Sequence, residues 1–409
     1  MLRELRESRY PVEITLLLVL CLALPLYEAP KNLAWLGYAL VWLANRLRGK
    51  NLGGRWDLWD TLIATWIASG YVVAAFAGID GSEWRGAGDL LRYGSILWLV
   101  KRAGYEPREM RWVMGTLVAS TVIGLAMGYA RMCSGIGQSG TLQLHSVGHV
   151  NHTAIYIAIM LGACAAWLFA CWKTWRPGTR AVALAVTALV LISLVVTASR
   201  GAIGIGLAML PLLALAWWPR WRVPLIASAA AVAVVVAAAF AMQIDVVRKQ
   251  EENVSAQNVL SFRDGIWRMG LEGWRRFPWF GVGMDNYQLI THERVKAWRT
   301  QAGENYDAAR YVHFPHAHSL YVNTLAERGS AGFAVLAVVL GAWLAWLARF
   351  RPRPQDDDLD WLLWGAAAAA WFVTVAAGTV NTTLHHEHGI LAVLLLGLWL
   401  SRRTGPAAS

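Results

Sequence analysis

Charged residues are scarce in this chain. Asp, Glu, Lys and Arg together make up 15% of its 409 residues, whereas soluble domains contain about a quarter. Hydrophobic residues make up 57%, and they recur in runs that are too long and too frequent for a soluble core. This composition excludes an ordinary soluble globular protein and indicates an all-α, polytopic integral membrane protein.

Cysteine is also rare, with four residues, of which three fall within apolar runs and Cys133 stands alone in a predicted loop. This number and spacing exclude a disulfide framework. The first apolar run is flanked by Glu4, Glu7 and Glu13, and no small-x-small cleavage motif follows Leu26. We therefore expect it to be a retained helix rather than a cleaved signal peptide.

The apolar runs predict about twelve membrane spans. They cover residues 13–27, 33–45, 58–78, 89–100, 112–130, 150–172, 181–198, 202–218, 223–242, 319–348, 360–380 and 389–401. Basic residues gather in alternate connections, and the short connections between them contain little beyond Lys31, Arg85 and Arg131. The positive-inside rule then places both termini in the cytoplasm. The net charge of +11 follows from this topology and does not indicate nucleic-acid binding.

One long connection breaks this pattern and divides the chain into residues 1–242 with spans one to nine, a large periplasmic loop at 243–318, and residues 319–409 with the last three spans. The loop holds ten Lys and Arg, nine Asp and Glu, and six aromatics within 267–287. Disordered linkers are poor in aromatics, so we expect the loop to fold against the membrane face. No other separable domain and no internal repeat is evident.

Within this loop, apolar residues at helical spacing predict an amphipathic helix over Ser261–Phe277, with Ser261 as its N-cap and Phe262 in its apolar stripe. Pro278 then ends the helix. Trp274 and Trp279 are able to hold sugars or to form the loop core, and we favour the core.

Ionisable chemistry concentrates where the loop meets the tenth span. His313, His316 and His318 lie within six residues, and Asn323 and Glu327 follow one turn apart. Such residues are costly beside lipid, which makes them a functional hypothesis.

Pro315 favours a helix that starts near His316 and places His318 in its first turn. The helix dipole there disfavours imidazolium and keeps the ring neutral, as a general base requires.

Two other roles stay open for these histidines. They could be interfacial capping and hydrogen-bonding groups. They could also hold a metal, although no spacing is diagnostic; that site would combine His313, His316 and His318 with His385, His386 or His388.

Arg200 lies at the outer end of two apolar helices, and Arg263 begins the predicted loop helix. Arginine is expensive at such a place unless it snorkels to the surface or meets an anion. Two arginines near an outward-facing base suit a diphosphate, whose oxygens accept bidentate guanidinium hydrogen bonds.

The predicted outer segments contain no Asp-x-Asp motif and no clustered carboxylates. Metal-dependent phosphate chemistry is therefore disfavoured, and no metal or other cofactor is expected. The dense acidic run Asp356–Asp360 is predicted to be a solvated cytoplasmic linker. His145, His149 and His152 enter the sixth span and could line the same cavity, although we favour polar interface residues.

Five short motifs, in their order along twelve spans with one large loop, resemble the O-antigen ligase and polymerase superfamily. They are Ser199-Arg-Gly-Ala202, Arg263-Asp-Gly-Ile-Trp267, Pro278-Trp-Phe-Gly-Val-Gly283, His316-Ala-His-Ser319 and Glu327-Arg-Gly329.

The resemblance implies a metal-independent bacterial inner-membrane glycosyltransferase of the C-type architecture, with a periplasmic active site. In the ligase branch, the donor is an undecaprenyl diphosphate-linked O-antigen and the acceptor is a sugar hydroxyl of lipid A-core, with membrane lipid around both. The family's essential histidine falls on His318, with His316 as a competitor, and its diphosphate-handling arginines fall on Arg200 and Arg263. We add Arg131 and Asn323 as candidate substrate-binding residues.

The mechanism that fits is a single inverting displacement, in which His318 accepts the acceptor proton and Arg200 and Arg263 stabilise the departing diphosphate. An O-antigen polymerase and a protein O-oligosaccharyltransferase share this chemistry. A lipid-linked glycan flippase or transporter predicts ionisable groups near mid-membrane, whereas here they concentrate at the outer face.

Overall fold

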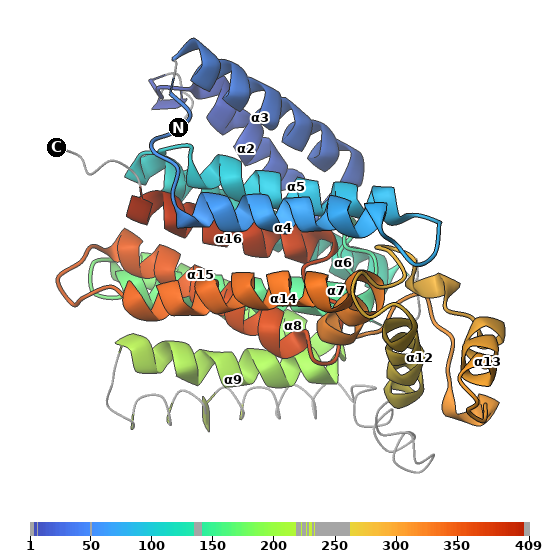
Figure 1. Ribbon diagram of the computed structural model, residues 1–409. Coiled ribbons are helices and arrows are strands. Elements are labelled where there is room, and N and C mark those ends of the chain that lie inside the picture. Colours follow the sequence, from blue (N-terminus) through green and yellow to red (C-terminus); the bar gives the residue numbers. More distant parts are fainter. Residues whose placement is uncertain are drawn as a thin grey trace.

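The structure is a computed structural model that describes residues 4–5, 7–49, 51–134, 141–217, 222, 226, 229, 230, 233 and 262–404. In these ranges the chain forms helices and no strand (Figure 1). The helices are α2 Pro11–Ala23, α3 Glu28–Arg48, α4 Leu58–Ala75, α5 Glu83–Lys101, α6 Pro107–Cys133, α7 Val150–Cys171, α8 Pro177–Val196, α9 Arg200–Trp217, α12 Arg263–Arg276, η1 Tyr287–Leu289, α13 His292–Gln301, η2 Ala308–Arg310, α14 Leu320–Arg349, α15 Asp358–Ala377 and α16 His386–Thr404.

Seven of the described helices, α4, α6, α7, α8, α9, α14 and α15, are long and apolar enough to cross a membrane. This supports the expected polytopic membrane protein. Helices also occur at four further predicted spans, as α2, α3, α5 and α16. The ninth predicted span, 223–242, falls almost wholly outside the described residues, so the number of twelve stays a prediction.

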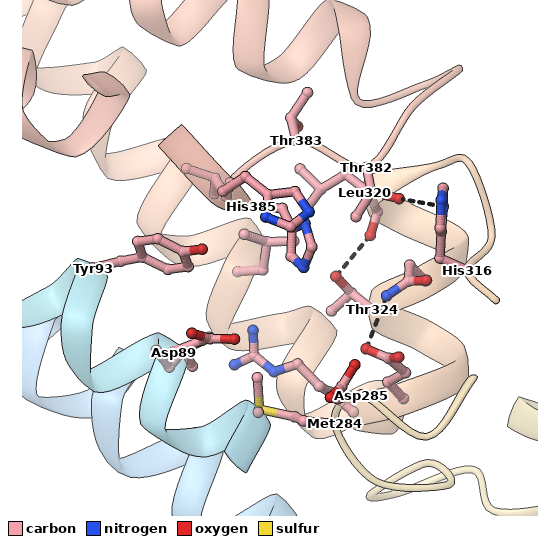
Figure 2. A pocket seen from close by; sticks show the side chains of 18 of the residues that line it. Asp89, Tyr93, Met284, Asp285, His316, Leu320, Thr324, Thr382, Thr383 and His385 are labelled. Atoms are coloured by element: carbon pink, nitrogen blue, oxygen red, sulfur yellow. Dashed lines mark hydrogen bonds between the residues drawn. The ribbon is translucent and has the colours of Figure 1, made fainter. Parts of the chain in front are cut away.

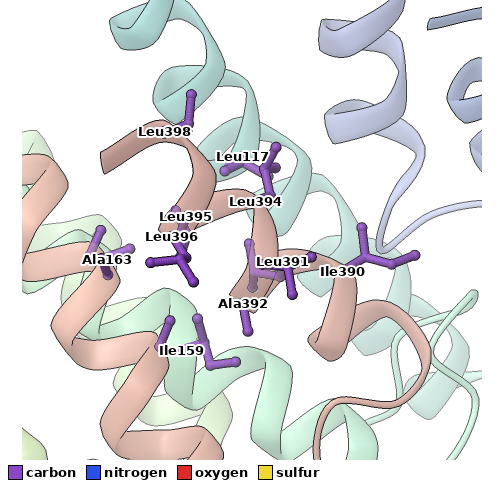
Figure 3. Packing of buried hydrophobic residues seen from close by; sticks show 14 of the residues in the cluster. Leu117, Ile159, Ala163, Ile390, Leu391, Ala392, Leu394, Leu395, Leu396 and Leu398 are labelled. Atoms are coloured by element: carbon purple, nitrogen blue, oxygen red, sulfur yellow. The ribbon is translucent and has the colours of Figure 1, made fainter. Parts of the chain in front are cut away.

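Helix α7 lies at the centre of the bundle. It is apolar on all sides, which is typical of a helix with no lipid-facing or water-facing surface. Of its most hydrophobic window, 83% is buried, against 28% for α8 and for α9. It packs against α8, α9, α15 and α16. Figure 3 shows Ile159 of α7, Leu396 of α16 and Leu117 of α6, which belong to one buried cluster.

Helix α14 is broken at Gly329, whose φ of 60° and ψ of −166° are not helical. The turn Pro278–Gly283 lies against this break, and four backbone hydrogen bonds of 2.8–3.1 Å join it to residues 326–331. The donors and acceptors are Ser330 to Pro278, Ala331 to Trp279, Val282 to Ala326 and Gly283 to Glu327. We call these two segments the clasp. It satisfies backbone groups that a broken helix would otherwise leave unpaired.

The long connection before α14 has a hydrophobic core of its own. Its buried members are Ile266, Met269, Val282, Tyr287, Ile290, Val295, Tyr311, Ala317 and Ala326. As predicted, an amphipathic helix is present, α12. Its expected cap, Ser261, lies outside the described residues. Phe262 was expected in the apolar stripe but is 61% exposed, because its φ of 60° directs the chain away from the helix axis.

The two loop tryptophans have different surroundings. Trp274 is half-buried, and its indole N–H donates to Ser330 Oγ at 3.1 Å. Trp279 is 70% exposed, because its backbone, rather than its side chain, makes the clasp. The prediction that Trp279 belongs to the loop core is therefore wrong.

The bundle has two polar ends. Helices α12 and α13 lie at one, which we call the loop end, and the α14–α15 connection lies at the other, which we call the far end (Figure 1). At the far end, Arg402 lies 2.9 Å from Asp357 and 3.0 Å from Asp360. The side chain of Asp357 also accepts from the Asp360 backbone N–H and so caps α15. The prediction of a solvated acidic linker is wrong here, because these carboxylates cap a helix and pair with arginine.

A side chain at position 329 should damage the clasp. The conformation of Gly329 is essentially restricted to glycine, and an added Cβ would overlap the Trp279 carbonyl group. We expect Gly329→Ala to destabilise the protein by about 3 kcal/mol, measured as a lower Tm in detergent by tryptophan fluorescence. Gly341→Ala is the control, since a Cβ there meets nothing within 4 Å. Equal Tm values for the two variants would contradict the clasp.

Candidate active site

Histidines from three distant parts of the chain meet at the loop end. The His152 ring centre, in the first turn of α7, lies 6.4 Å from His316, 4.9 Å from His386 and 5.1 Å from His388. The His316 and His318 rings lie 4.2 Å apart. His152 and His316 line the same cavity. The favoured interpretation of His152 as a polar interface residue is therefore wrong.

Residues 316–319, which we call the histidine turn, precede α14 and do not form its first turn. Ser319 is the N-cap, and its hydroxyl accepts from the Val322 N–H at 3.4 Å. His318 has a φ of 49° and lies outside the first turn that the sequence predicted for it. The helix begins at Leu320 because the Leu320 N–H donates to the carbonyls of Gly378 and Asn381, and a serine oxygen is a strong N-cap.

Both candidate bases are neutral at pH 7, for reasons other than the helix dipole. Burial lowers the pKa of His318 to about 3, and the neighbouring His316 ring and the Arg263 guanidinium act in the same direction. Burial and His385 lower the pKa of His316 to about 4. A neutral imidazole is able to accept a proton. Nδ1 of His318 is buried and has no hydrogen-bond partner among the described residues.

The two predicted arginines begin two different helices, and Arg263 lies near His318. Arg200 is the first residue of α9, and Arg263 is the first residue of α12. Arg263 Nε donates to the Val380 carbonyl at 3.1 Å. Burial, and then the charge of Arg200, lower the pKa of Arg263. Arg200 thus lies within electrostatic range of Arg263, and Arg263 lies within range of His318, which places positive charge beside a neutral base.

Asn323 joins the histidine turn to α14. Its Oδ1 accepts from the Ala317 N–H at 3.0 Å, and its Nδ2 donates to Glu327 Oε2 at 2.8 Å. Glu327 Oε1 also accepts from the Tyr287 N–H at 3.2 Å. Asn323 lines the cavity as well, so the structure gives it a positioning role, and its substrate-binding role stays a prediction.

Arg131 is separate from this group. It lies in the last turn of α6, is exposed, and its Nη1 lies 2.5 Å from His145 Nδ1. Neither residue lines the cavity. His313 is also turned away, with Nδ1 3.1 Å from the Ile290 carbonyl oxygen. Binding of substrate by Arg131 stays a prediction.

The cavity has a volume of ≈ 230 Å³ and is lined by acids as well as histidines. Figure 2 shows Asp89, Asp285, His316 and His385 around it, and Glu327 also contributes. The three acids come from three separate segments of the chain and share this lining only in the fold. In the described part of the chain, no group of three or more His, Cys, Asp or Glu is placed to hold a metal ion.

Residues 185–337 match a family model described as O-antigen ligase. This segment covers less than half of the chain, and it is similar to the O-antigen ligase family. The matched segment contains both predicted arginines, both candidate bases and both segments of the clasp. Members of this family are glycosyltransferase-like ligases and polymerases that act on lipid-linked glycans. The chain matches no curated protein.

Part of the cavity wall comes from outside the matched residues 185–337. Asp89, Tyr93, Thr382 and His385 line it from α5 and from the segment before α16. Thr382 Oγ1 lies 3.4 Å from His316 Nδ1. Their separation in sequence left no local signal that could have identified them.

Buried charges support this wall. Within residues 185–337, Arg328 is buried and its Nη2 donates to Ser69 Oγ at 2.6 Å. Lys31, expected in a short outer loop, is instead buried in α3 and pairs with Glu387 of α16. A buried lysine is costly unless its charge is paired, and Glu387 supplies that partner.

Loss of the Asn323 side chain should loosen the histidine turn. Without it, the Ala317 N–H loses its acceptor. We expect Asn323→Ala to raise amide hydrogen exchange at residues 316–319 by about tenfold, the equivalent of one lost hydrogen bond. Gln288→Ala is the control, because Gln288 lines the same cavity. Unchanged exchange in Asn323→Ala would show that the turn is held by other contacts.

Proposed function

We propose that the protein is an O-antigen ligase, which transfers a glycan from undecaprenyl diphosphate to a sugar hydroxyl of lipid A-core at the periplasmic face of the bacterial inner membrane. The observation that carries this proposal is a neutral, half-buried His318 within electrostatic range of Arg263, which is itself within range of Arg200. No metal or other cofactor takes part. The loop end would then be periplasmic, and both termini cytoplasmic.

In the proposed reaction the acceptor hydroxyl attacks the anomeric carbon of the donor sugar. The new glycosidic bond forms as the bond to the diphosphate oxygen breaks, and the hydroxyl proton passes to His318. One displacement inverts the anomeric centre. General-base catalysis of this kind contributes about 10²–10⁴ in rate.

Arg200 and Arg263 stabilise the negative charge that develops on the departing undecaprenyl diphosphate. The guanidinium fork suits phosphate oxygens geometrically. The same charges also affect the base. Because the positive charge of Arg263 lowers the pKa of His318, a bound diphosphate would offset that charge and raise the pKa. His318 would thus become a stronger base only when the donor is in place.

The ≈ 230 Å³ cavity is suited to hydroxyl-rich sugar, since carboxylates such as Asp89, Asp285 and Glu327 accept hydrogen bonds from hydroxyl groups. His316 faces this cavity, whereas His318 lies nearer the arginines. His316 therefore remains the competing base, and direct comparison of the two variants decides between them.

The test is transfer in vitro with purified protein, undecaprenyl diphosphate-linked glycan, lipid A-core and EDTA. We expect His318→Ala to lower kcat about 10²–10⁴-fold, His316→Ala to lower it much less, and Arg200→Ala to abolish measurable transfer. Tm values confirm that each variant is folded. Lengthened glycan on the lipid carrier would instead indicate a polymerase, and the absence of any covalent product would indicate a flippase or transporter.

The pH dependence tests the state of the base. Because burial, His316 and Arg263 lower the pKa of His318 to about 3, it stays neutral well below the usual histidine pKa of about 6.5. We expect kcat/KM for the donor to stay constant down to about pH 5, since this parameter reports the free enzyme. An acidic limb centred near pH 6.5 would show that an ordinary, solvated histidine is the base.

Removal of the positive charge of Arg263 should shift the acidic limb of the pH dependence of kcat/KM. Arg263→Gln removes a cation that lowers the pKa of His318, so the acidic limb is expected at higher pH than in the wild type. Arg85→Gln serves as the control, since Arg85 is exposed and paired with Asp285 at 2.6 Å. A limb that shifts equally in both variants would argue against a specific effect on His318.

A further inference from the structure

A second cavity lies at the far end of the bundle, opposite the proposed active site. Its volume is ≈ 890 Å³, within the usual range of small-molecule sites. The ends of α3, α5 and α16 and the starts of α2, α4 and α6 surround it. Seven basic and three acidic side chains line it. This excess of positive charge suits an anion.

Four of the basic side chains already have carboxylate partners. Arg46 lies 3.4 Å from Glu13, Lys101 lies 3.0 Å from Asp60, and Arg102 lies 2.7 Å from Asp60. Arg402 is paired with the acidic start of α15. These pairs use up much of the positive charge and belong to the framework of the cavity wall.

The other three basic side chains are not neutralised in this way. In the described part of the chain, no carboxylate lies within ion-pair distance of Arg9 or Arg55; the guanidinium of Arg9 instead lies 5.2 Å from the Tyr10 ring centre. Arg403 has only a distant partner, with Nη2 3.9 Å from Asp356. These three guanidinium groups are the ones available to an anion that enters the cavity.

Two further groups in the wall also lack partners. Ser401 is 2% exposed, and its Oγ has no hydrogen bond within the described chain. Nε and Nη2 of Arg403 are also buried atoms that have no hydrogen-bond partner within the described chain. Buried polar atoms are nearly always hydrogen-bonded in native structures. A hydroxyl donor and guanidinium donors that face one cavity therefore require an acceptor of hydrogen bonds, such as a phosphate oxygen.

Exposed apolar side chains lie close in sequence to the lining residues around Arg55. Leu47 is 62% exposed, Leu52 45% and Trp56 60%. Tryptophan is enriched at the boundary between lipid tails and headgroups, and basic pockets between membrane helices bind the headgroups of anionic lipids. Acyl chains could lie against the three apolar side chains while the phosphate reaches the guanidinium groups.

From these observations we propose that the far-end cavity binds the phosphate-bearing headgroup of an anionic phospholipid. Arg9, Arg55 and Arg403 supply the charge, and Ser401 supplies a hydrogen bond to a phosphate oxygen. The site is independent of the proposed glycan transfer, because none of these residues lines the cavity at the loop end.

The test measures lipid binding to the full chain in zwitterionic detergent by native mass spectrometry and by thermal shift. The probes are phosphatidylglycerol, phosphatidylcholine and inorganic phosphate. We expect phosphatidylglycerol to bind and to raise Tm, and the double variant Arg9→Gln/Arg55→Gln to weaken its binding about tenfold or more. Both arginines are exposed, so this variant should fold; Ser401→Ala should weaken binding by a smaller factor.

Arg349→Gln is the matched control, because Arg349 is an exposed arginine at the end of α14 that does not line the cavity. Its phosphatidylglycerol binding should equal that of the wild type. Equal effects of phosphatidylcholine, or equal losses in Arg349→Gln and the double variant, would overturn the proposal. An equal thermal shift with inorganic phosphate alone would also overturn it, because the ligand would then be a soluble anion.

Discussion

The four backbone hydrogen bonds of the clasp are the contact on which the rest of the loop end depends. A membrane helix that breaks at Gly329 frees backbone groups that lipid cannot satisfy. The turn Pro278–Gly283 satisfies them. The same contact joins the long connection to α14, so the hydrophobic core of the connection and the histidine turn are held in one place relative to the bundle. Both segments of the clasp carry motifs noted in the sequence, and the backbone of each motif makes the hydrogen bonds of the clasp.

The polar groups above the clasp form one continuous network. Glu327 accepts from the Tyr287 N–H and from Asn323, and Asn323 in turn accepts from the Ala317 N–H between the two candidate bases. Each member is buried or half-buried, so each lost bond would leave an unpaired group. Such a network fixes the orientation of the histidine turn, which a loop in solvent would not do.

Charge at the loop end is arranged so that histidines stay neutral near arginines. Burial is the main cause for His316 and His318, and for His318 the positive charge of Arg263 adds to it. The far end has the opposite arrangement, where most basic side chains pair with carboxylates of the chain and three guanidinium groups are left for an outside anion. The two ends thus differ in how burial and pairing control their charge.

The membrane class and most helix positions could be predicted from the sequence alone, because long apolar runs have few alternatives in lipid. The sequence also suggested Arg200, Arg263, His316 and His318 as candidates, since charged and polar residues beside lipid are rare enough to be informative. The predicted helix start near His316 is wrong, because α14 begins at Leu320, whose N–H donates to the carbonyls of Gly378 and Asn381, more than fifty residues away.

Only the tertiary structure decided which groups meet. Asp89, Asp285 and Glu327 line one cavity, and His152 joins His316, His386 and His388, although each pair is separated by dozens to hundreds of residues. Helical periodicity reports contacts three or four residues apart, so it revealed the pair Asn323 and Glu327. It carries no information on which helix ends share a cavity, because that depends on how the side chains of many helices pack together.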